Sequence, residues 1–120
     1  MSARTVLVIG AGAAGLTAAI RAGEAGARVT CLNAHPRVGL KILMSGGTRC
    51  NVTHREVDER DYWGGSRPFV RRVLRPFTPE QTLAWFAAMG VELKRIGAGA
   101  LVPSVRYSAY CWACVASAVK

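Results

Sequence analysis

The sequence predicts an α/β fold that begins with a parallel βαβ unit, and three features of its N-terminal segment predict it. A short run of apolar, mostly β-branched residues over 5–9 is typical of a buried strand. A glycine-rich turn follows, and the alanine-rich segment 16–25 then has the small apolar side chains of a helix packed on a parallel sheet. A second β-branched run over 28–32 completes the unit at the expected distance.

The turn between the first strand and the helix has the spacing of a dinucleotide-binding motif. From Gly10 to Gly15 it reads Gly-Ala-Gly-Ala-Ala-Gly, in the strand–turn–helix context that the motif requires. Gly10 permits the tight turn, Gly12 lets the backbone approach a pyrophosphate, and Gly15 lets helix and strand pack closely. Phosphates would lie at the helix N-terminus, beside Ala13 and Ala14, because free N–H groups and the helix dipole favour an anion there. The alternative is a structural turn that binds no ligand.

The end of the second strand departs from the dinucleotide pattern. Such strands usually end on Asp or Glu, whose carboxylate binds the ribose hydroxyls, whereas this chain has Asn33. An amide accepts a hydrogen bond without the help of a charge, so we expect the ribose contact to be weaker by about 1 kcal/mol.

Gly26 follows the predicted helix, and a glycine at this position commonly ends a helix.

Length and composition limit the class of protein. A chain of 120 residues forms one domain at most, and a hydrophobic fraction of 51% is enough for a core. No apolar run approaches the roughly 18 residues of a membrane helix, and the N-terminus lacks the layout of a signal peptide. We therefore expect a cytoplasmic protein that does not bind membranes.

The net charge is +9, from 16 Lys and Arg against 7 Asp and Glu. Such a balance occurs in nucleic-acid-binding proteins. Here the arginines are scattered, and the only tight group is Arg71, Arg72 and Arg75. Because no basic platform interleaved with aromatic residues accompanies them, we do not expect nucleic acid as a partner, and an anionic cofactor explains the charge equally well.

The four cysteines are not expected to form a disulfide framework in a reducing compartment. Cys111 and Cys114 have the C-x-x-C spacing of redox and metal sites, but no second Cys or His pair at metal spacing accompanies them, so we expect no metal. Their neighbours are apolar and offer nothing that would stabilise a thiolate. Two cysteines in an apolar segment are the simpler interpretation.

Residues 34–54 are expected to form a long connection, and a connection of this length inside a compact domain is usually functional. The part over 45–51 is rich in small residues and hydrogen-bond donors, and its Gly-Gly pair permits a backbone that presents successive N–H groups to an anion. The alternative is a flexible surface turn. The candidate ligand-binding residues of this connection are Lys41, Ser45, Gly46, Gly47, Thr48, Arg49, Cys50 and Asn51.

These motifs together resemble the N-terminus of a flavoprotein family, the NAD(P)/FAD-dependent oxidoreductases of the aminoacetone-oxidase-like and BaiN type. The resemblance is carried by the glycine turn, Gly-Leu-Lys-Ile-Leu at 39–43, Ser-Gly-Gly at 45–47 and Arg-Cys-Asn-Val-Thr at 49–53. It extends more weakly to about residue 103. Members of the family are much longer, so the resemblance implies that this chain is the N-terminal portion only, as a truncated or frameshifted product or a fragment.

The resemblance implies FAD as the cofactor, with NAD(P)H as a candidate electron donor. In the family the glycine turn holds the FAD pyrophosphate, the acid at the strand end holds the adenosine ribose, and the later motifs lie along the flavin. Asn33 takes the place of that acid here. The chain also has Thr48 where glycine is frequent in the family and His54 where asparagine is frequent.

We therefore expect residues 1–54 to form an FAD-binding core and residues 55–120 a helix–strand extension at the start of a substrate-side region. In the extension, Thr78 followed by Pro79 is a helix start signal, and Gly90 is its stop. A shorter helix is expected from a Ser66 cap to about residue 75. A half-exposed strand is expected over 91–96, and a glycine turn over 97–99 then leads into residues 100–103. An incomplete parallel sheet leaves edges and apolar faces uncovered, so self-association is expected.

The sequence thus predicts the FAD-binding N-terminal portion of a flavin-dependent oxidoreductase that acts on a small molecule of unknown identity. No side chain is assigned a catalytic role, because His35 and His54 are isolated and are candidates by residue type alone. One alternative is a basic α/β module that binds a nucleotide or an anionic partner and catalyses nothing. Another is a fragment of an NAD-dependent dehydrogenase, which the motif at 45–51 disfavours.

Overall fold

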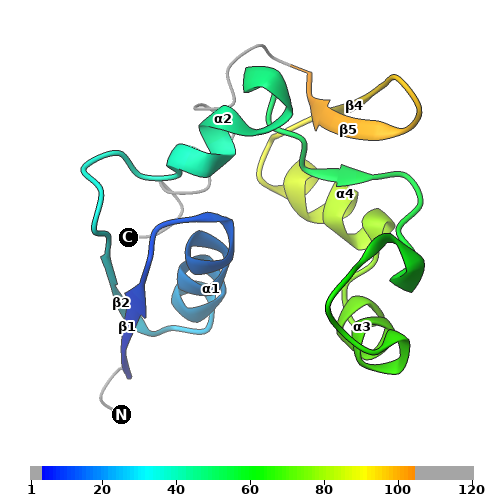
Figure 1. Ribbon diagram of the computed structural model, residues 1–120. Coiled ribbons are helices and arrows are strands. Elements are labelled where there is room, and N and C mark those ends of the chain that lie inside the picture. The colour runs from blue at the N-terminus through cyan, green and yellow to red at the C-terminus, as the bar shows by residue number, and fades with distance from the viewer. Residues whose placement is uncertain (1–3, 105–120) are drawn as a thin grey trace. The chain divides into compact units, whose positions relative to one another are not determined.

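The computed structural model describes residues 4–104, which belong to two compact units, one up to Cys50 and the other from Asn51 onward (Figure 1). The segment with Cys111 and Cys114 lies outside the described residues. In chain order the elements are β1 (Thr5–Ile9), α1 (Ala13–Glu24), β2 (Arg28–Leu32), α2 (Leu40–Thr48), β3 (Thr53–His54), a 3₁₀ turn (Glu59–Asp61), α3 (Arg67–Leu74), α4 (Pro79–Ala88), β4 (Leu93–Ile96) and β5 (Ala100–Pro103).

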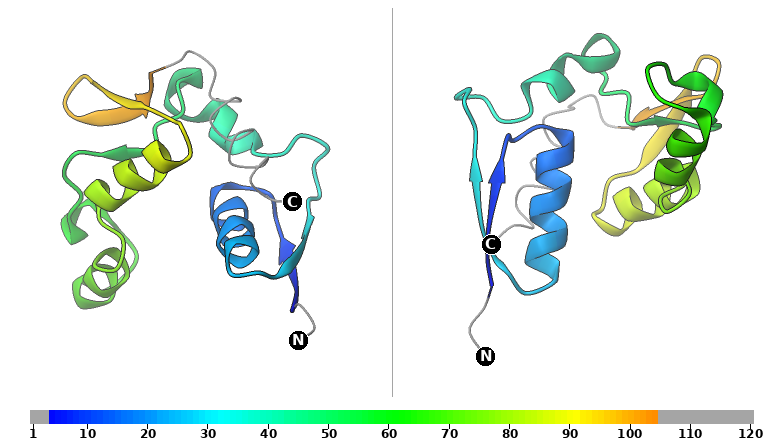
Figure 2. Two further views of the ribbon diagram at one scale, coloured as in Figure 1. Left: turned by 180° about the vertical axis from the view of Figure 1, so that it is seen from behind. Right: turned by 60° about the horizontal axis from the view of Figure 1, so that its bottom comes forward.

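The first unit is built on the predicted βαβ motif. Strands β1 and β2 are parallel, in a register that sets Thr5 opposite Arg28 and Ile9 opposite Leu32. Helix α1 lies along the pair of strands (Figure 2) and buries Leu16, Ala19 and Ile20. The predicted α/β class is therefore confirmed, and both strands have the predicted bounds.

Helix α1 begins earlier than its sequence pattern predicted, at Ala13 instead of Leu16. The reason is that Gly12 serves as its N-cap, and the Leu16 N–H donates to the Gly12 carbonyl at 2.9 Å. The second half of the glycine turn is thus already helix. At the other end Gly26 has a positive φ of 83° just beyond the last turn, as predicted.

The β1–β2 sheet has one face that no described residue covers. Leu7, Ile9 and Leu32 are exposed, Ile9 to 83% of its surface. They share one face because side chains alternate along a strand. A parallel sheet is normally covered on both faces, so residues 4–50 form only part of such a layered structure.

The expectation of an irregular connection over 34–54 is wrong in part, because α2 forms within it (Figure 1). The apolar residues after Gly39 form a short helix that buries Ile42. The helix is broken near its end, where Ser45 has an extended ψ of 151° and the next two glycines have positive φ. The run 40–44 is too short for its helical period to be recognised in the sequence.

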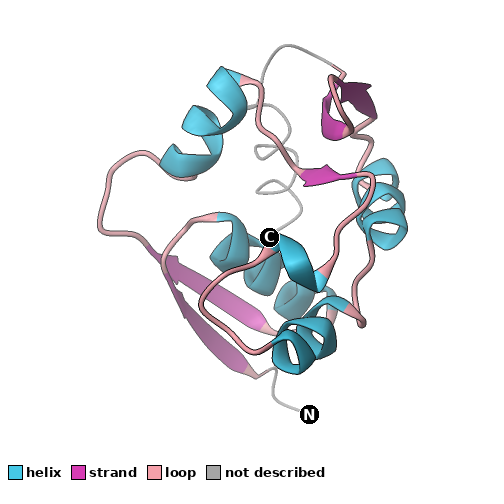
Figure 3. Cartoon of the chain, turned by 45° about the vertical axis from the view of Figure 1, so that its right-hand side comes forward, coloured by secondary structure: helices cyan, strands magenta, loops and turns pink. Residues whose placement is uncertain are grey.

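The second unit is a small antiparallel sheet with helices (Figure 3). Its strand order is β3-β5-β4, with Thr53 opposite Leu101 and Leu93 opposite Pro103. Phe86 of α4 and Val102 of β5 are each only 2% exposed and belong to its core. Strand β3 therefore belongs to this unit, although its two residues were expected in the cofactor-binding core.

The helix starts of the second unit follow the predicted capping signals. Thr78 is the N-cap of α4, with a reciprocal capping box in which its hydroxyl accepts from the Gln81 N–H and the Gln81 side chain accepts from the Thr78 N–H. Ser66 is the N-cap of α3, without a hydrogen bond from its side chain. Gly90 follows α4 with a φ of 78°, which confirms the predicted stop. Within residues 4–104, no helix is long and apolar enough to cross a membrane.

Candidate functional site

The glycine turn of the first unit has the geometry that its sequence predicts. Gly10 has a φ of 99°, a left-handed conformation that favours glycine, and its N–H donates to the Leu32 carbonyl at 2.7 Å. A Cβ atom on Gly15 would lie 1.8 Å from the Gly10 carbonyl oxygen, so only glycine lets α1 approach the turn this closely. The turn is therefore held against both neighbouring elements by its own backbone.

Among the described residues, none blocks the space in front of the N-terminus of α1, so a ligand could bind there. A Cβ atom on Gly12 would meet nothing within 4 Å, so there is room in front of this residue. The N-cap makes no side-chain hydrogen bond, and the first turn contains no acidic residue. The first N–H groups of a helix have no partner within the helix, and Ala13 and Ala14, which carry two of them, are exposed. The site thus offers room and donors for a phosphate group.

Asn33 lies at the end of β2, where the ribose contact was predicted, and its side chain is hydrogen-bonded to the turn. Its Oδ1 accepts from the Ala11 N–H at 3.1 Å, and its Nδ2 donates to the His35 carbonyl at 2.5 Å. A longer contact of 3.5 Å joins Nδ2 to the Arg37 carbonyl. The oxygen has a second lone pair, so it retains acceptor capacity for a hydroxyl group.

Gly39, which was not among the candidate site residues, joins α2 to the glycine turn. Its N–H donates to the Ala11 carbonyl at 2.9 Å, and its own carbonyl accepts from Leu43 within α2. Gly39 is buried and has a φ of 67°. With the bond from Asn33, both backbone polar groups of Ala11 are hydrogen-bonded. The sequence signal that could have indicated this role is the position of Gly39 directly before the apolar run that forms α2.

The segment after α2 turns two of its N–H groups inward. The Cys50 N–H donates to the Ser45 carbonyl at 3.1 Å and the Arg49 N–H to the Gly46 carbonyl at 3.3 Å. Gly46 and Gly47 are both left-handed, with φ of 58° and 62°, which differs from the alternating conformations of an anion-binding nest. The expected row of outward N–H groups is thus absent at residues 49 and 50.

The side chains of the predicted flavin-side residues are divided between surface and core. Cys50 is 2% exposed and has a φ of 57°, so it is a packed residue of the first unit. Lys41 and Arg49 are exposed on the same unit, whereas Asn51 is the first residue of the second. The structure therefore brings Gly10, Gly12, Gly15 and Asn33 together around one turn, and it places α2 beside that turn through Gly39.

Both histidines make local contacts with nearby residues. The His35 Nδ1 accepts from the Arg37 N–H at 3.0 Å within a local turn. The His54 ring packs against Gly99, where a Cβ atom would lie 2.8 Å from the ring. Among residues 4–104 there is no group of three or more side chains that could hold a metal ion.

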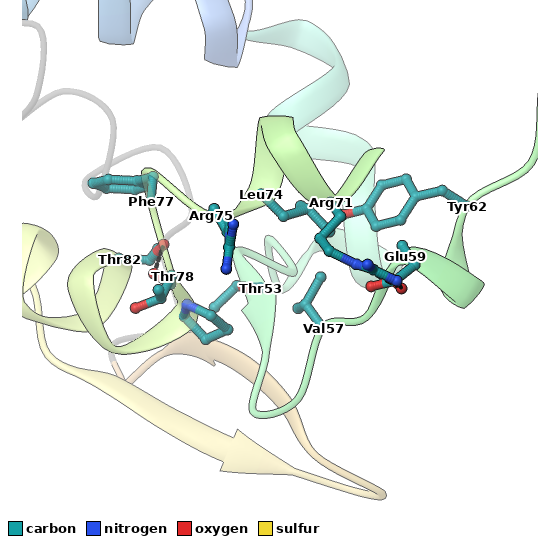
Figure 4. Close-up of a pocket in the computed structure, with 11 residues that line it drawn as sticks. Thr53, Val57, Glu59, Tyr62, Arg71, Leu74, Arg75, Phe77, Thr78 and Thr82 are labelled. Carbon is teal, nitrogen blue, oxygen red and sulfur yellow. Dashed lines mark hydrogen bonds and ion pairs between the residues drawn. The ribbon is translucent and has the colours of Figure 1, made fainter. Parts of the chain in front are cut away.

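Two cavities of the second unit are lined entirely by described residues. One of about 370 Å³ is formed by α3, α4 and the segments beside them, and it is lined by apolar, hydroxyl and arginine side chains (Figure 4). The other, of about 520 Å³, is lined mainly by charged residues around His54 and Arg95. Neither cavity was predicted, because their walls come from segments that are distant in the chain.

Comparison with known proteins gives a family match and several curated relatives. The HI0933-like protein Rossmann domain family matches residues 4–120. The chain is 39% identical over 92 residues to the 3-dehydro-bile acid delta(4,6)-reductase of Clostridium scindens. These 92 residues are 75% of this chain and 22% of that protein. It is 43% identical over 72 residues to the ribosomal RNA dihydrouridine synthase of Escherichia coli, over 60% of this chain and 18% of the relative. A component of the opine oxidase of Rhizobium meliloti is 44% identical over 62 residues, 52% of this chain and 12% of the relative. The chain thus spans about a fifth of the length of the first two relatives.

Proposed function

Because the chain belongs to the HI0933-like Rossmann domain family, we propose that its first unit binds FAD, as the N-terminal portion of a flavin-dependent oxidoreductase. The observation that carries the proposal is the open N-terminus of α1 behind Gly12, which has free space, no capping side chain and no acidic residue in its first turn. Relatives named as a reductase and an oxidase support the reaction class.

In this proposal the first N–H groups of α1 bind the pyrophosphate. Ala13 and Ala14 are exposed and supply N–H groups at the positive end of the helix dipole. The Asn33 oxygen accepts from a ribose hydroxyl through the lone pair that Ala11 does not use. The exposed Lys41 and Arg49 add positive charge to the same unit.

The oxidation–reduction chemistry in this proposal belongs to the cofactor, since a bound flavin supplies hydride transfer. In this proposal the described residues bind and orient it. NAD(P)H is the proposed electron donor, and a small molecule is the proposed substrate. The names of the three relatives refer to three different substrates. The proposal therefore names the cofactor and the class of reaction, and it names no particular substrate.

Titration of the purified chain with FAD, followed by flavin absorbance and fluorescence, tests the proposal. The informative variant is Gly12→Ala, because its new methyl group occupies the space in front of the turn while meeting no protein atom within 4 Å. The matched control is Gly23→Ala, on the same helix, whose Cβ atom also meets nothing within 4 Å.

We expect Gly12→Ala to weaken FAD binding at least about tenfold, which corresponds to about 1.4 kcal/mol, and Gly23→Ala to leave it unchanged. A folded chain that takes up no FAD would contradict the proposal. Equal affinities of the two variants would remove the glycine turn from the site.

A further inference from the structure

The cavity of about 370 Å³ in the second unit has the size of a small-molecule site, for which about 300–1,000 Å³ is typical. Part of its wall is apolar, from Val57, Leu74, Phe77 and Pro79. Hydroxyl groups of threonine and tyrosine side chains complete the wall around the charged residues (Figure 4). An apolar wall with a few polar groups is the usual composition of a site for an organic molecule.

Two of the three charged side chains that line this cavity neutralise each other. The Arg71 Nε donates to the Glu59 Oε1 at 2.9 Å, and a second nitrogen of the same guanidinium contacts the same oxygen. The hydrogen bond from Arg71 lowers the pKa of Glu59 below its usual value, so the carboxylate is ionised at neutral pH. The pair therefore adds no net charge to the cavity.

The third charged side chain of the cavity, that of Arg75, has no partner among residues 4–104. Its guanidinium makes no hydrogen bond or ion pair with any residue of the described range 4–104. In Figure 4 it extends from the C-cap position of α3 into the space bordered by Thr53 and Thr78. With two arginines and one glutamate on its wall, the cavity carries one net positive charge. A guanidinium group beside apolar surface is suited to a carboxylate or phosphate group, which it can bind through two parallel hydrogen bonds.

We propose that this cavity binds an organic anion, a small molecule with one carboxylate or phosphate group and an apolar body, and that Arg75 binds the anionic group. The apolar wall then covers the body of the ligand, and the Glu59–Arg71 pair holds one side of the cavity without attracting or repelling it. The site lies entirely within the second unit, so the proposal does not depend on FAD binding by the first.

Benzoate is a suitable probe, since it combines one carboxylate with an apolar ring. Its binding to the chain can be measured by calorimetry, with benzamide as the uncharged analogue of the same shape and inorganic phosphate as an anion without an apolar body. The informative variant is Arg75→Gln. The matched control is Arg72→Gln, which removes a charge from the same exposed helix at a residue that does not line the cavity.

We expect saturable benzoate binding that Arg75→Gln weakens at least about tenfold and Arg72→Gln leaves unchanged, with both variants folded by circular dichroism. Benzamide should bind more weakly than benzoate and respond to neither variant. Phosphate that binds more tightly than benzoate, with the same dependence on Arg75, assigns the site to phosphate-bearing ligands. Absence of saturable binding of both anions, or equal weakening by the two variants, would overturn the proposal.

Discussion

The side-chain oxygen of Asn33 accepts a hydrogen bond from the backbone N–H of Ala11 at 3.1 Å, and this bond ties the end of β2 to the glycine turn. The carbonyl of the same residue, Ala11, accepts a hydrogen bond from the Gly39 N–H at 2.9 Å. Asn33 is therefore part of the support of the turn as well as the proposed ribose contact. A ribose ligand at this position would share an oxygen that already has one partner.

Substitutions of Asn33 separate these two tasks. Asn33→Ala removes the bond to Ala11, so we expect a loss of about 1 kcal/mol in the free energy of unfolding together with weaker FAD binding. Asn33→Asp keeps the acceptor and adds a charge for the ribose, so it should bind FAD more tightly than the parent chain. It should not raise stability, because the Nδ2 bond to the His35 carbonyl is lost. Denaturant unfolding and FAD titration measure both effects, and an unchanged affinity of the Asp variant would exclude Asn33 from the ribose site.

Gly39→Ala tests the connection between α2 and the turn. Gly39 has a φ of 67°, which costs any other residue about 1–2 kcal/mol, while the new Cβ atom would contact only Ile42, at an ordinary 3.4 Å or more. The control is Gly90→Ala, since Gly90 has a φ of 78° and open space around it in the second unit. We expect both variants to lower the unfolding temperature and only Gly39→Ala to weaken FAD binding. If the two variants bind FAD equally well, α2 does not support the site.

The pair of Glu59 and Arg71 predicts a dependence of stability on acid. Hydrogen bonding by Arg71 lowers the pKa of Glu59 from its ordinary value of 4.5. A carboxyl group whose pKa is lower in the folded state stabilises the fold above its unfolded pKa, and this contribution is lost as the pH falls through the folded pKa. Below about pH 4.5 the parent chain should therefore lose more stability than Glu59→Gln.

The measurement is the unfolding temperature as a function of pH for the parent chain and two variants. Glu56→Gln is the control, because Glu56 makes no ion pair with the described residues. It should follow the parent chain through the acid range. A Glu59→Gln curve parallel to that of the parent would show that the ion pair does not contribute to the fold.

The local elements that the sequence predicts correctly are those with strong local signals. β-Branched runs predict β1 and β2 with their bounds, and Thr78 with Pro79 predicts the start of α4. Helix α2 was not predicted, because its apolar run is short and glycines interrupt it. Strand β3 was not predicted as a strand either, since a segment of only Thr53 and His54 becomes one by pairing with β5, far along the chain.

The site divides in the same way. The spacing of Gly10, Gly12 and Gly15 identified the turn, because the backbone requirements of such a turn are local and glycine meets them. The bonds that Asn33 and Gly39 make to Ala11, and the cavity around Arg75, join segments that are distant in the chain. The sequence by itself thus determined the βαβ class and the glycine turn. Tertiary structure alone decided which side chains support that turn and which arginine of the cavity remains unpaired within residues 4–104, because those contacts depend on how the segments pack.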